Sequence, residues 1–165
     1  MGVDGETDFQ DFVRTRGPAL SRTAYLLTGD HQLAEDLVQI ALSRVYGRWS
    51  RLTAGGDPEA YLRRIMVNER TSWWRRRRYE SVGRQSLIDV TTVADEADQV
   101  SRRVAMLAAL DQLTARQRAV LVLRYFDDLS VDQTARALGC SAGTVKSNTS
   151  DALARLRTLA LEEVS

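Results

Sequence analysis

The stretch SVDQTARALGCSAGTVKSNTSDALARL, residues 130–156, decides the fold of the C-terminal part of the chain. Ser130 and Gln133 form a capping-box pattern, which predicts the start of a short helix. Gly139 can adopt the positive φ that a sharp turn requires, and Ser141 is suited to cap a second, longer helix. A short helix, a sharp turn and a second helix leaving at a steep angle predict a helix-turn-helix.

The outward face of this second helix carries short polar residues and one cation, which suits entry into a DNA groove. Lysine can contact phosphate or guanine, and asparagine can pair with adenine. The backbone N–H groups at the start of the helix point outward and can bind a phosphate. An ordinary helical hairpin with a polar face is the alternative. The candidate residues of this face are Gly143, Lys146, Ser147, Asn148 and Ser150, with Ser141 at the cap of the helix.

A run of aromatic and basic residues at 61–79 is the second feature. Asp57 followed by Pro58 predicts the start of the helix that carries this run. Aromatic faces stack on unpaired bases and arginines follow the backbone of a single strand. A solvated basic helix end, with one tryptophan in the core, explains the run equally well. The candidate residues are Asn68, Trp73, Trp74, Arg75, Arg76, Arg77 and Arg78.

The segment AEDLVQ at residues 34–39 is the third feature. It lies in a predicted helix, residues 32–51, with an apolar stripe at four-residue steps. The stripe consists of Leu33, Leu37, Ala41, Val45 and Trp49. The acidic and amide edge of this helix could dock on a partner, although a solvated surface is the usual explanation of such an edge.

The composition of the chain favours two helical domains. Its 165 residues are 44% hydrophobic and include only two prolines, while the net charge of +1 gives no nucleic-acid signal. Residues 81–98 predict a flexible linker, because a stretch rich in Ser, Thr, Asp and Gln cannot bury enough apolar surface to offset its ordering entropy. We therefore expect an all-α protein with small domains at residues 8–80 and 99–162. Helical periodicity covers residues 8–27, 32–51 and 58–78, and resumes near 100. Gly29 is suited to end the first of these helices in the left-handed conformation, and Asp30 to cap the second. Thr114 and Gln117 form a further capping-box pattern.

Residues that carry chemistry are scarce. The single cysteine, Cys140, excludes an internal disulfide and fits a reducing compartment, and His31 is expected at the surface. Asp127 and Asp128 are expected to lie in a loop between two helices and to cap a helix end there. No Gly-rich phosphate loop, zinc spacing, signal peptide or run of 18 apolar residues occurs. We expect no enzymatic activity, no catalytic residue, no metal, no cofactor, no small-molecule substrate and no membrane contact, in a cytoplasmic protein.

Taken in this order, the segments resemble extracytoplasmic-function RNA polymerase sigma factors, and most of all the small actinobacterial branch called SigE-like. Residues 23–30, TAYLLTGD, resemble the first helix of that branch. Residues 34–39 resemble the polymerase-binding signature of the family, and residues 61–78 its promoter-melting helix. Residues 113–156, including GTVKS at 143–147, resemble its second conserved domain.

The resemblance implies a division of roles between sigma region 2 in the first domain and sigma region 4 in the second. Core RNA polymerase would bind the helix with Leu33, Asp36, Leu37, Gln39 and Arg44. At the −10 element, the loop 50–57 and Asn68 would capture a flipped base, and residues 73–78 would hold the strands. The −35 contacts would come from Arg116, Arg118, Arg124, Ser141, Gly143, Thr144, Lys146, Ser147 and Asn148.

The partners implied are core RNA polymerase and promoter DNA, with nucleoid association when polymerase is bound and an anti-sigma factor as a further candidate. One departure from the family is Asp151 in the recognition helix. Its carboxylate would repel a nearby phosphate if it faces DNA and would be harmless if it faces sideways.

Two other functions are open alternatives. The last fifty residues also resemble the DNA-binding domain of quorum-sensing-type response regulators, so a stand-alone helix-turn-helix regulator is one of them. It leaves residues 8–80 without a role, and it would bind duplex DNA without polymerase. A pure interaction protein is the other, and it leaves the basic and aromatic run idle.

Overall fold

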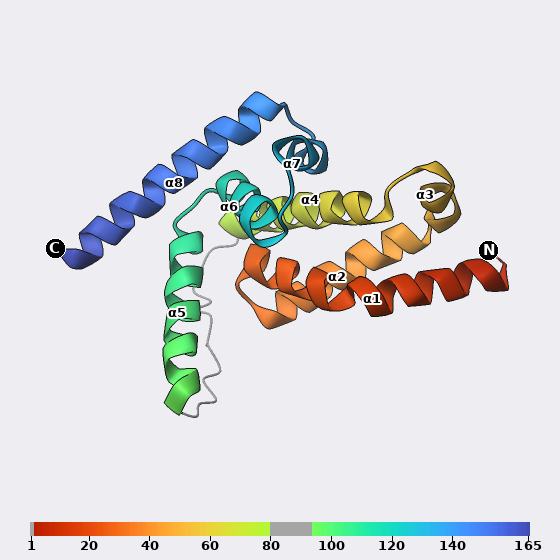
Figure 1. Ribbon diagram of the computed structural model, residues 1–165, viewed down its shortest axis with the longest axis horizontal. Helices are drawn as coiled ribbons and strands as arrows, with labels where there is room; N and C mark the ends of the chain where they lie inside the picture. Colours follow the sequence, from red (N-terminus) through yellow and green to blue (C-terminus); the bar gives the residue numbers. More distant parts are fainter. Residues whose placement is uncertain (1, 80–93) are drawn as a thin grey trace.

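The computed structural model describes residues 2–79 and 94–165, without the side chains of residues 74, 75, 77–79 and 94–96. The regular structure of the described residues is helical (Figure 1). The first half comprises α1 (Val3–Thr28), α2 (His31–Tyr46), α3 (Trp49–Gly55) and α4 (Pro58–Tyr79). The second half comprises α5 (Ala94–Asp111), α6 (Ala115–Leu121), the π-helical turn η1 (Val122–Phe126), α7 (Val131–Leu138) and α8 (Ala142–Val164).

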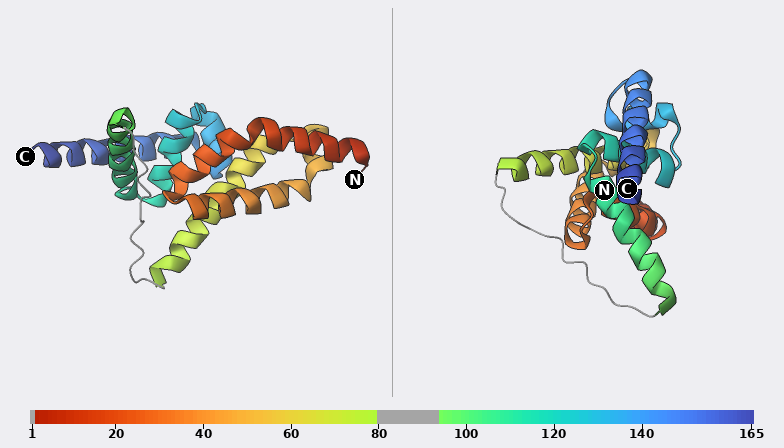
Figure 2. Two further views of the ribbon diagram at one scale, coloured as in Figure 1. Left: turned by 90° about the horizontal axis from the view of Figure 1, so that it is seen from below. Right: turned by 90° about the vertical axis from the view of Figure 1, so that its left-hand side faces the viewer.

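The turn between α1 and α2 has the predicted chemistry. Gly29 ends α1 in the left-handed conformation, with φ +73°, and its N–H donates to the carbonyl of Tyr25. Asp30 then caps α2, because its side chain accepts a hydrogen bond from the N–H of Leu33. The chain therefore reverses within two residues, and α1 and α2 pack side by side (Figures 1 and 2).

An aromatic cluster joins the start of α1 to the end of α2 and the start of α3. The ring of Trp49 lies 5.2 Å from the rings of both Phe9 and Phe12, and Phe9 also lies 4.9 Å from Tyr46, measured between centroids. Trp49 is the last member of the predicted stripe on 32–51, but the helix is interrupted before it, at residues 47–48. The prediction of one continuous helix was wrong there, since the interruption turns Trp49 onto α1.

The second half begins its helices where the capping patterns predict. The side chain of Thr114 accepts from the N–H of Gln117, and the side chain of Gln117 accepts from the N–H of Thr114. Ser130 and Gln133 make the same reciprocal pair at the start of α7. Both predicted capping boxes are confirmed. Between them, the helix that starts at α6 widens into the π-helical turn η1.

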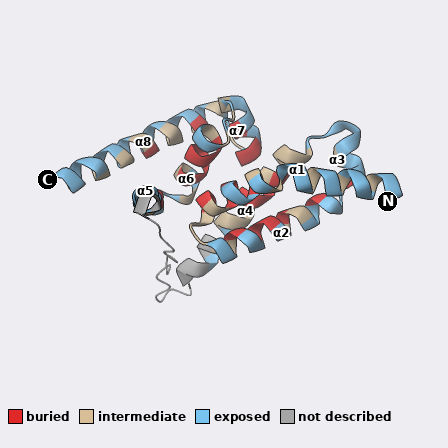
Figure 3. Cartoon of the chain, turned by 60° about the horizontal axis from the view of Figure 1, so that its bottom comes forward, coloured by how far each residue is buried: buried red, intermediate tan, exposed pale blue. Residues whose placement is uncertain are grey.

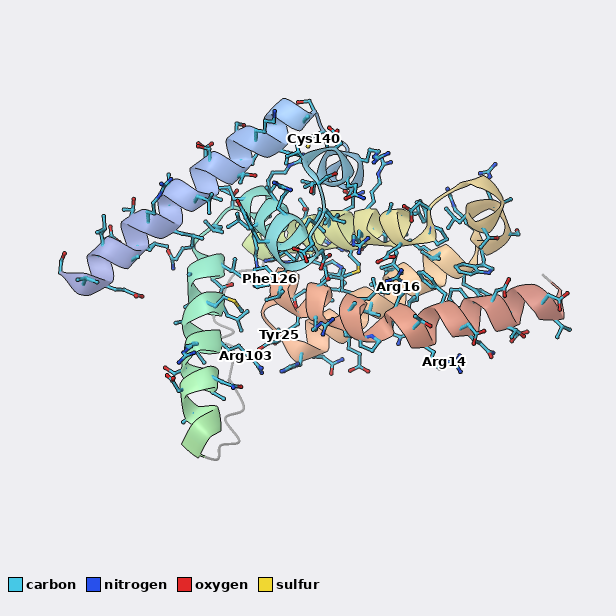
Figure 4. All side chains as sticks on the ribbon, in the orientation of Figure 1. Arg14, Arg16, Tyr25, Arg103, Phe126 and Cys140 are labelled. Atoms are coloured by element: carbon cyan, nitrogen blue, oxygen red, sulfur yellow. The ribbon has the colours of Figure 1, made fainter. Side chains whose placement is uncertain are left out.

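Apolar side chains from both halves form one continuous core. Helix α7 packs on α4, and η1 packs on the end of α1, where Tyr25 and Phe126 lie at the junction (Figure 4). Buried residues gather in α2, α4, α6 and α7, whereas most of α8 faces solvent (Figure 3). The two predicted domains are thus in contact.

Two helix boundaries differ from prediction. Helix α1 begins at Val3, five residues before the expected start at residue 8, and α5 begins at Ala94, six residues before the expected start near residue 100. Residues 3–7 of α1 and residues 97–99 of α5 are mostly exposed, so apolar periodicity gives no signal of them. The predicted linker 81–98 lies outside the described residues up to residue 93, and from residue 94 it is helical.

Candidate DNA and polymerase interfaces

The turn between α7 and α8 has helix-turn-helix geometry. Gly139 is left-handed, with φ +64°, and the side chain of Ser141 accepts from the N–H of Thr144 at 3.1 Å. Leu138 and Val145, which are 6% and 0% exposed, pack into the core where the helices meet. The predicted turn and cap are therefore both present. Cys140 lies in this turn, half-buried against the core (Figure 4).

The outward face of α8 is polar along its first turns. Lys146 and Ser147 are exposed, while Asn148 is half-buried and its amide donates to the carbonyl of Thr144 at 2.9 Å. Ser141 and Gly143 are also exposed. Of the predicted face, Lys146, Ser147 and Ser150 are exposed side chains of α8. The Ser147 hydroxyl, like the Asn148 amide, donates to the carbonyl of Thr144, at 3.3 Å.

Asp151 lies at one edge of this outward face. Val145 and Ala152 are fully buried and mark the inner side of α8. Lys146 and Asp151 are five positions apart, so at about 100° per residue they lie roughly 140° apart around the helix axis. Asp151 is exposed and borders the polar strip on the side opposite Lys146. It therefore faces neither the centre of the strip nor the protein core.

On α4, Asn68 is exposed and Trp73 is half-buried against the core, whereas Arg76 is exposed. Asp57 caps the helix, because its side chain accepts from the N–H groups at positions 59 and 60. The side chains of Trp74, Arg75, Arg77 and Arg78 lie outside the described residues. The amide of Asn68 and the guanidinium of Arg76 are thus placed on the surface of one long helix.

The described surface of α2 consists of polar residues around a buried stripe. Asp36 and Gln39 are exposed, and Asp36 accepts a hydrogen bond from Gln32. Arg44 pairs with Glu69 of α4 at 2.5 Å. Leu33 is half-buried, but Leu37 is 0% exposed. Leu37 therefore supports the helix from inside and cannot contact a partner, contrary to the role that the resemblance implied for it.

The three arginines expected on −35 phosphates differ in exposure. Arg116 is exposed and donates to the carbonyl of Leu138 at 3.2 Å. Arg124 is half-buried and donates to the carbonyl of Leu129 at 2.6 Å. Arg118 is only 2% exposed, and its guanidinium donates to the carbonyl of Leu26 in α1. In this conformation Arg118 cannot contact DNA, because it closes the end of a helix in the other half of the chain.

Comparison with known proteins divides the chain into the same two halves as the sequence analysis does. Residues 12–79 match the family model for sigma-70 region 2, and residues 103–156 match the model for sigma-70 region 4. The RNA polymerase sigma-E factor of Streptomyces avermitilis is 47% identical over 150 residues, which cover 91% of this chain and 83% of that protein. The chain belongs to the extracytoplasmic-function sigma factors.

More distant sigma factors agree over similar lengths. The ECF RNA polymerase sigma factor SigM of Mycobacterium tuberculosis is 33% identical and is matched over 92% of this chain and 76% of its own. The solved structure of the sigma factor RpoE from Bartonella quintana, in complex with the anti-sigma factor NepR, superposes with a TM-score of 0.68 at 29% identity, covering 92% of this chain and 96% of that one. CnrH, solved with the cytosolic domain of CnrY, shares the fold, with a TM-score of 0.70 at 22% identity.

As a sigma factor, the chain binds core RNA polymerase and directs it to promoter DNA to initiate transcription. The alternative of a stand-alone regulator has no comparable support, because it leaves the region 2 match without a role.

Among the described residues, no group of three or more His, Cys, Asp or Glu side chains could hold a metal ion. None of the described helices is both long enough and apolar enough to cross a bilayer.

The sequence did not predict the polar cluster that joins the two halves of this sigma factor. Asp127 accepts a hydrogen bond from the hydroxyl of Thr23 at 2.6 Å, and its other oxygen pairs with Arg63 at 3.2 Å. Asp127 was expected to cap a helix, and it bridges α1 and α4 instead. Thr23 and Asp127 are 104 positions apart, so no local pattern could have indicated the contact.

Proposed function

We propose that the sigma-factor function is divided among three helices: α2 for core polymerase, α4 for the −10 element and α8 for the −35 element. The observation that supports this division most strongly is the helix-turn-helix of α7 and α8, in a chain that presents a basic helix, α4, in its other half. The protein supplies binding and positioning and carries out no chemical step of its own.

Helix α8 is suited to the major groove of the −35 element. Lys146 is the only lysine in the sequence and is exposed in the second turn of α8. The neighbouring serine at 147 is short enough to let the helix approach base edges, and the N–H groups near Ser141 can bind a phosphate. Arg116, which is exposed on α6, would contact the backbone beside the groove. Arg118 and Arg124 would join it only after they leave their internal partners.

Helix α4 is suited to a melted −10 element. Asn68 is an exposed amide with free capacity to hydrogen-bond a base edge, and the arginines at 75–78 begin about two turns beyond it. Flipping a base out of the duplex costs a few kcal/mol of stacking free energy, which contacts with the protein must offset. Stacking on an aromatic face returns about 1–3 kcal/mol per base, and Trp73 or Trp74 would supply such a face.

Helix α2 is proposed to dock on the polymerase through Asp36 and Gln39, flanked by Leu33 and Arg44. Asp36 and Gln39 are exposed on a helix whose opposite side is fixed in the core by Leu37. Because α2 is held rigidly in the core, it loses little conformational entropy when the polymerase covers its exposed side, and this favours binding.

The site of action would be the cytoplasm, on the nucleoid when polymerase is bound. An anti-sigma factor is a proposed further partner, because the structurally similar sigma factors RpoE and CnrH were solved with NepR and with the cytosolic domain of CnrY.

In vitro transcription tests the proposal. The purified chain is added to core RNA polymerase from Streptomyces coelicolor with a library of genomic DNA fragments, and the 5′ ends of the transcripts are sequenced. We expect transcripts that depend on the chain and share two sequence elements upstream of their starts. Duplex binding by the chain alone, with no effect of core polymerase, would instead support a stand-alone regulator.

A further inference from the structure

We propose that Arg44 and Arg70 are positioning residues for promoter melting, because they anchor α4 to its neighbouring helices directly beyond Asn68. This inference rests on the proposed capture of a flipped base by Asn68. The anchors lie within the first half of the chain. They involve two charged residues, Glu69 and Arg70, that follow Asn68 in the sequence.

Glu69 and Arg70 occupy positions of α4 where apolar residues are expected. Leu62 and Met66, which are both 0% exposed, mark the inner side of the helix. The same spacing of three and four residues continues through positions 69, 70 and 73, and Trp73 is half-buried against the core. The inner face of α4 therefore changes from apolar to charged at residue 69 and becomes apolar again at residue 73.

Both charged side chains bind neighbouring helices of the same half. The Glu69 side chain is 15% exposed, and its carboxylate pairs with the guanidinium of Arg44 in α2 at 2.5 Å. The Nε–H group of Arg70 donates to the carbonyl of Leu27, at the end of α1, at 2.6 Å. That carbonyl is among the last of α1, which have no partner within the helix. Two consecutive residues thus tie α4 to α2 and to α1.

These contacts add direction more than stability. An ion pair on the inner face of a helix stabilises it no more than apolar side chains that fill the same space, because both charges lose hydration. Apolar contacts are non-directional, whereas an ion pair or a hydrogen bond to a carbonyl is strong only within a narrow range of distance and angle. The two contacts therefore fix the rotation of α4 and its position along its own axis beyond Met66.

The rotation of α4 decides where the amide of Asn68 lies. Asn68 is exposed and lies about 100° from Glu69 around the helix axis. The tips of helical side chains lie about 5–6 Å from the axis, so a rotation by about 20° would move them by about 2 Å. A binding site must hold its groups to within about 0.5 Å. The end of α4 projects beyond the other helices (Figure 2), so the anchors supply the fixation that packing does not.

Replacement of Glu69 by Met tests the proposal, because Met fills an apolar position with a side chain of similar length. Holoenzyme is assembled at a saturating concentration of core polymerase, and opening of a promoter from the transcription library is measured by permanganate reactivity near −10. We expect opening to fall about fivefold, the upper end of what a pair with one exposed partner contributes. The Tm of the free chain and its affinity for core polymerase should not fall.

Further variants separate positioning from a general loss of stability. Glu69→Gln keeps an oxygen that can accept from Arg44, so it should retain more opening than Glu69→Met. Arg44→Met should match Glu69→Met, and the double variant should lose no more than either single variant, because both remove the same contact. Glu163→Met, the same change at an exposed position of α8, should open the promoter as the parent does. Additive losses in the double variant, or a loss of opening that only follows a fall in Tm, would overturn the proposal.

The second anchor has a test of its own. Arg70→Met removes the donor to the carbonyl of Leu27 and should lower opening, whereas Arg70→Lys keeps a cationic donor and should retain more of it. A direct contact between Arg70 and a phosphate would instead make the salt dependence of duplex binding flatter by about 0.9 in slope in Arg70→Met. A flatter slope, or unchanged opening, would remove Arg70 from the anchors.

Asn68→Ala in the same assay separates this inference from the proposed function. If Asn68→Ala lowers opening and Glu69→Met does not, the anchor is overturned and the flipped-base role stands. If Glu69→Met lowers opening and Asn68→Ala does not, the flipped-base role is refuted, and the anchor holds α4 for another contact with the promoter. If neither variant changes opening, both are refuted.

Discussion

The proposed role of Lys146 makes a quantitative prediction about salt. Lys146 is the one cation in the first three turns of α8 and is exposed beside the polar strip. Each phosphate neutralised by a protein releases condensed counterions, so the slope of log K against log salt changes by about 0.9 for one contact. Replacing Lys146 by Gln should therefore flatten that slope by about 0.9. At about 0.1 M salt the same release corresponds to a roughly eightfold loss of affinity.

The assay is fluorescence anisotropy of a labelled promoter duplex, titrated with the holoenzyme between 50 and 200 mM salt. Arg157→Gln is the matched control, because Arg157 is also an exposed cation of α8 but lies eleven positions further along the helix. At about 1.5 Å per residue this is roughly 16 Å from Lys146, beyond the proposed groove contact. An unchanged slope in Lys146→Gln, or an equal change in Arg157→Gln, would refute the assignment of α8 to the −35 phosphates.

Four further predictions concern single substitutions. Asn68→Ala should weaken promoter opening, measured by permanganate reactivity, by roughly tenfold, as expected for the loss of base-edge hydrogen bonds, while duplex binding changes less; equal losses would contradict the flipped-base role. Asp36→Arg should lower the affinity for core polymerase roughly tenfold by charge reversal with native circular dichroism, whereas Glu163→Arg on α8 should not; unchanged affinity would remove α2 from the interface. Asp151→Asn should raise the affinity of holoenzyme for the −35 duplex roughly threefold, because a carboxylate about 6 Å from a phosphate in water costs about 0.7 kcal/mol; no change at low salt would show that it lies away from DNA. Gly29→Ala should destabilise the fold by about 1–2 kcal/mol, because an L-residue must adopt left-handed backbone, and so lower the Tm by roughly 3–6 °C; an unchanged Tm by calorimetry would contradict the strained geometry at Gly29.

Local chemistry predicts the helix ends of this protein well. The capping boxes at Thr114 and Ser130, the left-handed glycines 29 and 139 and the cap at Ser141 all formed as expected. Each of these features involves residues no more than four positions apart, and the backbone donors and acceptors that they satisfy are set by helix geometry alone. The helix-turn-helix, which depends on such features, was therefore predictable.

Features that depend on contacts between distant residues were not predictable. The burial of Arg118 requires the end of α1, 92 positions earlier in the sequence, to supply a carbonyl acceptor. The interruption at Gly47 lies within a sequence that keeps its apolar spacing, and the packing of Trp49 on Phe9 and Phe12 accounts for it.

Leu37 shows how a motif can mislead. The resemblance assigned it to the polymerase interface, whereas the four-residue apolar stripe placed it in the core. The structure agrees with the stripe, because Leu37 is 0% exposed. For a residue inside a family signature, helical position thus decides whether the side chain makes a contact itself or supports its neighbours.

Site-directed cleavage of promoter DNA tests the central claim most directly. The chain has a single cysteine, so in a Cys140→Ser background an iron–EDTA reagent can be attached at Ser72→Cys on α4 or at Ala154→Cys on α8, both exposed positions. In the holoenzyme bound to its promoter, we predict cleavage near −10 from the first position and near −35 from the second, about 25 base pairs apart, or roughly 85 Å. Cleavage by both reagents at one place, or by neither, would contradict the assignment of the two promoter elements to the two halves of the chain.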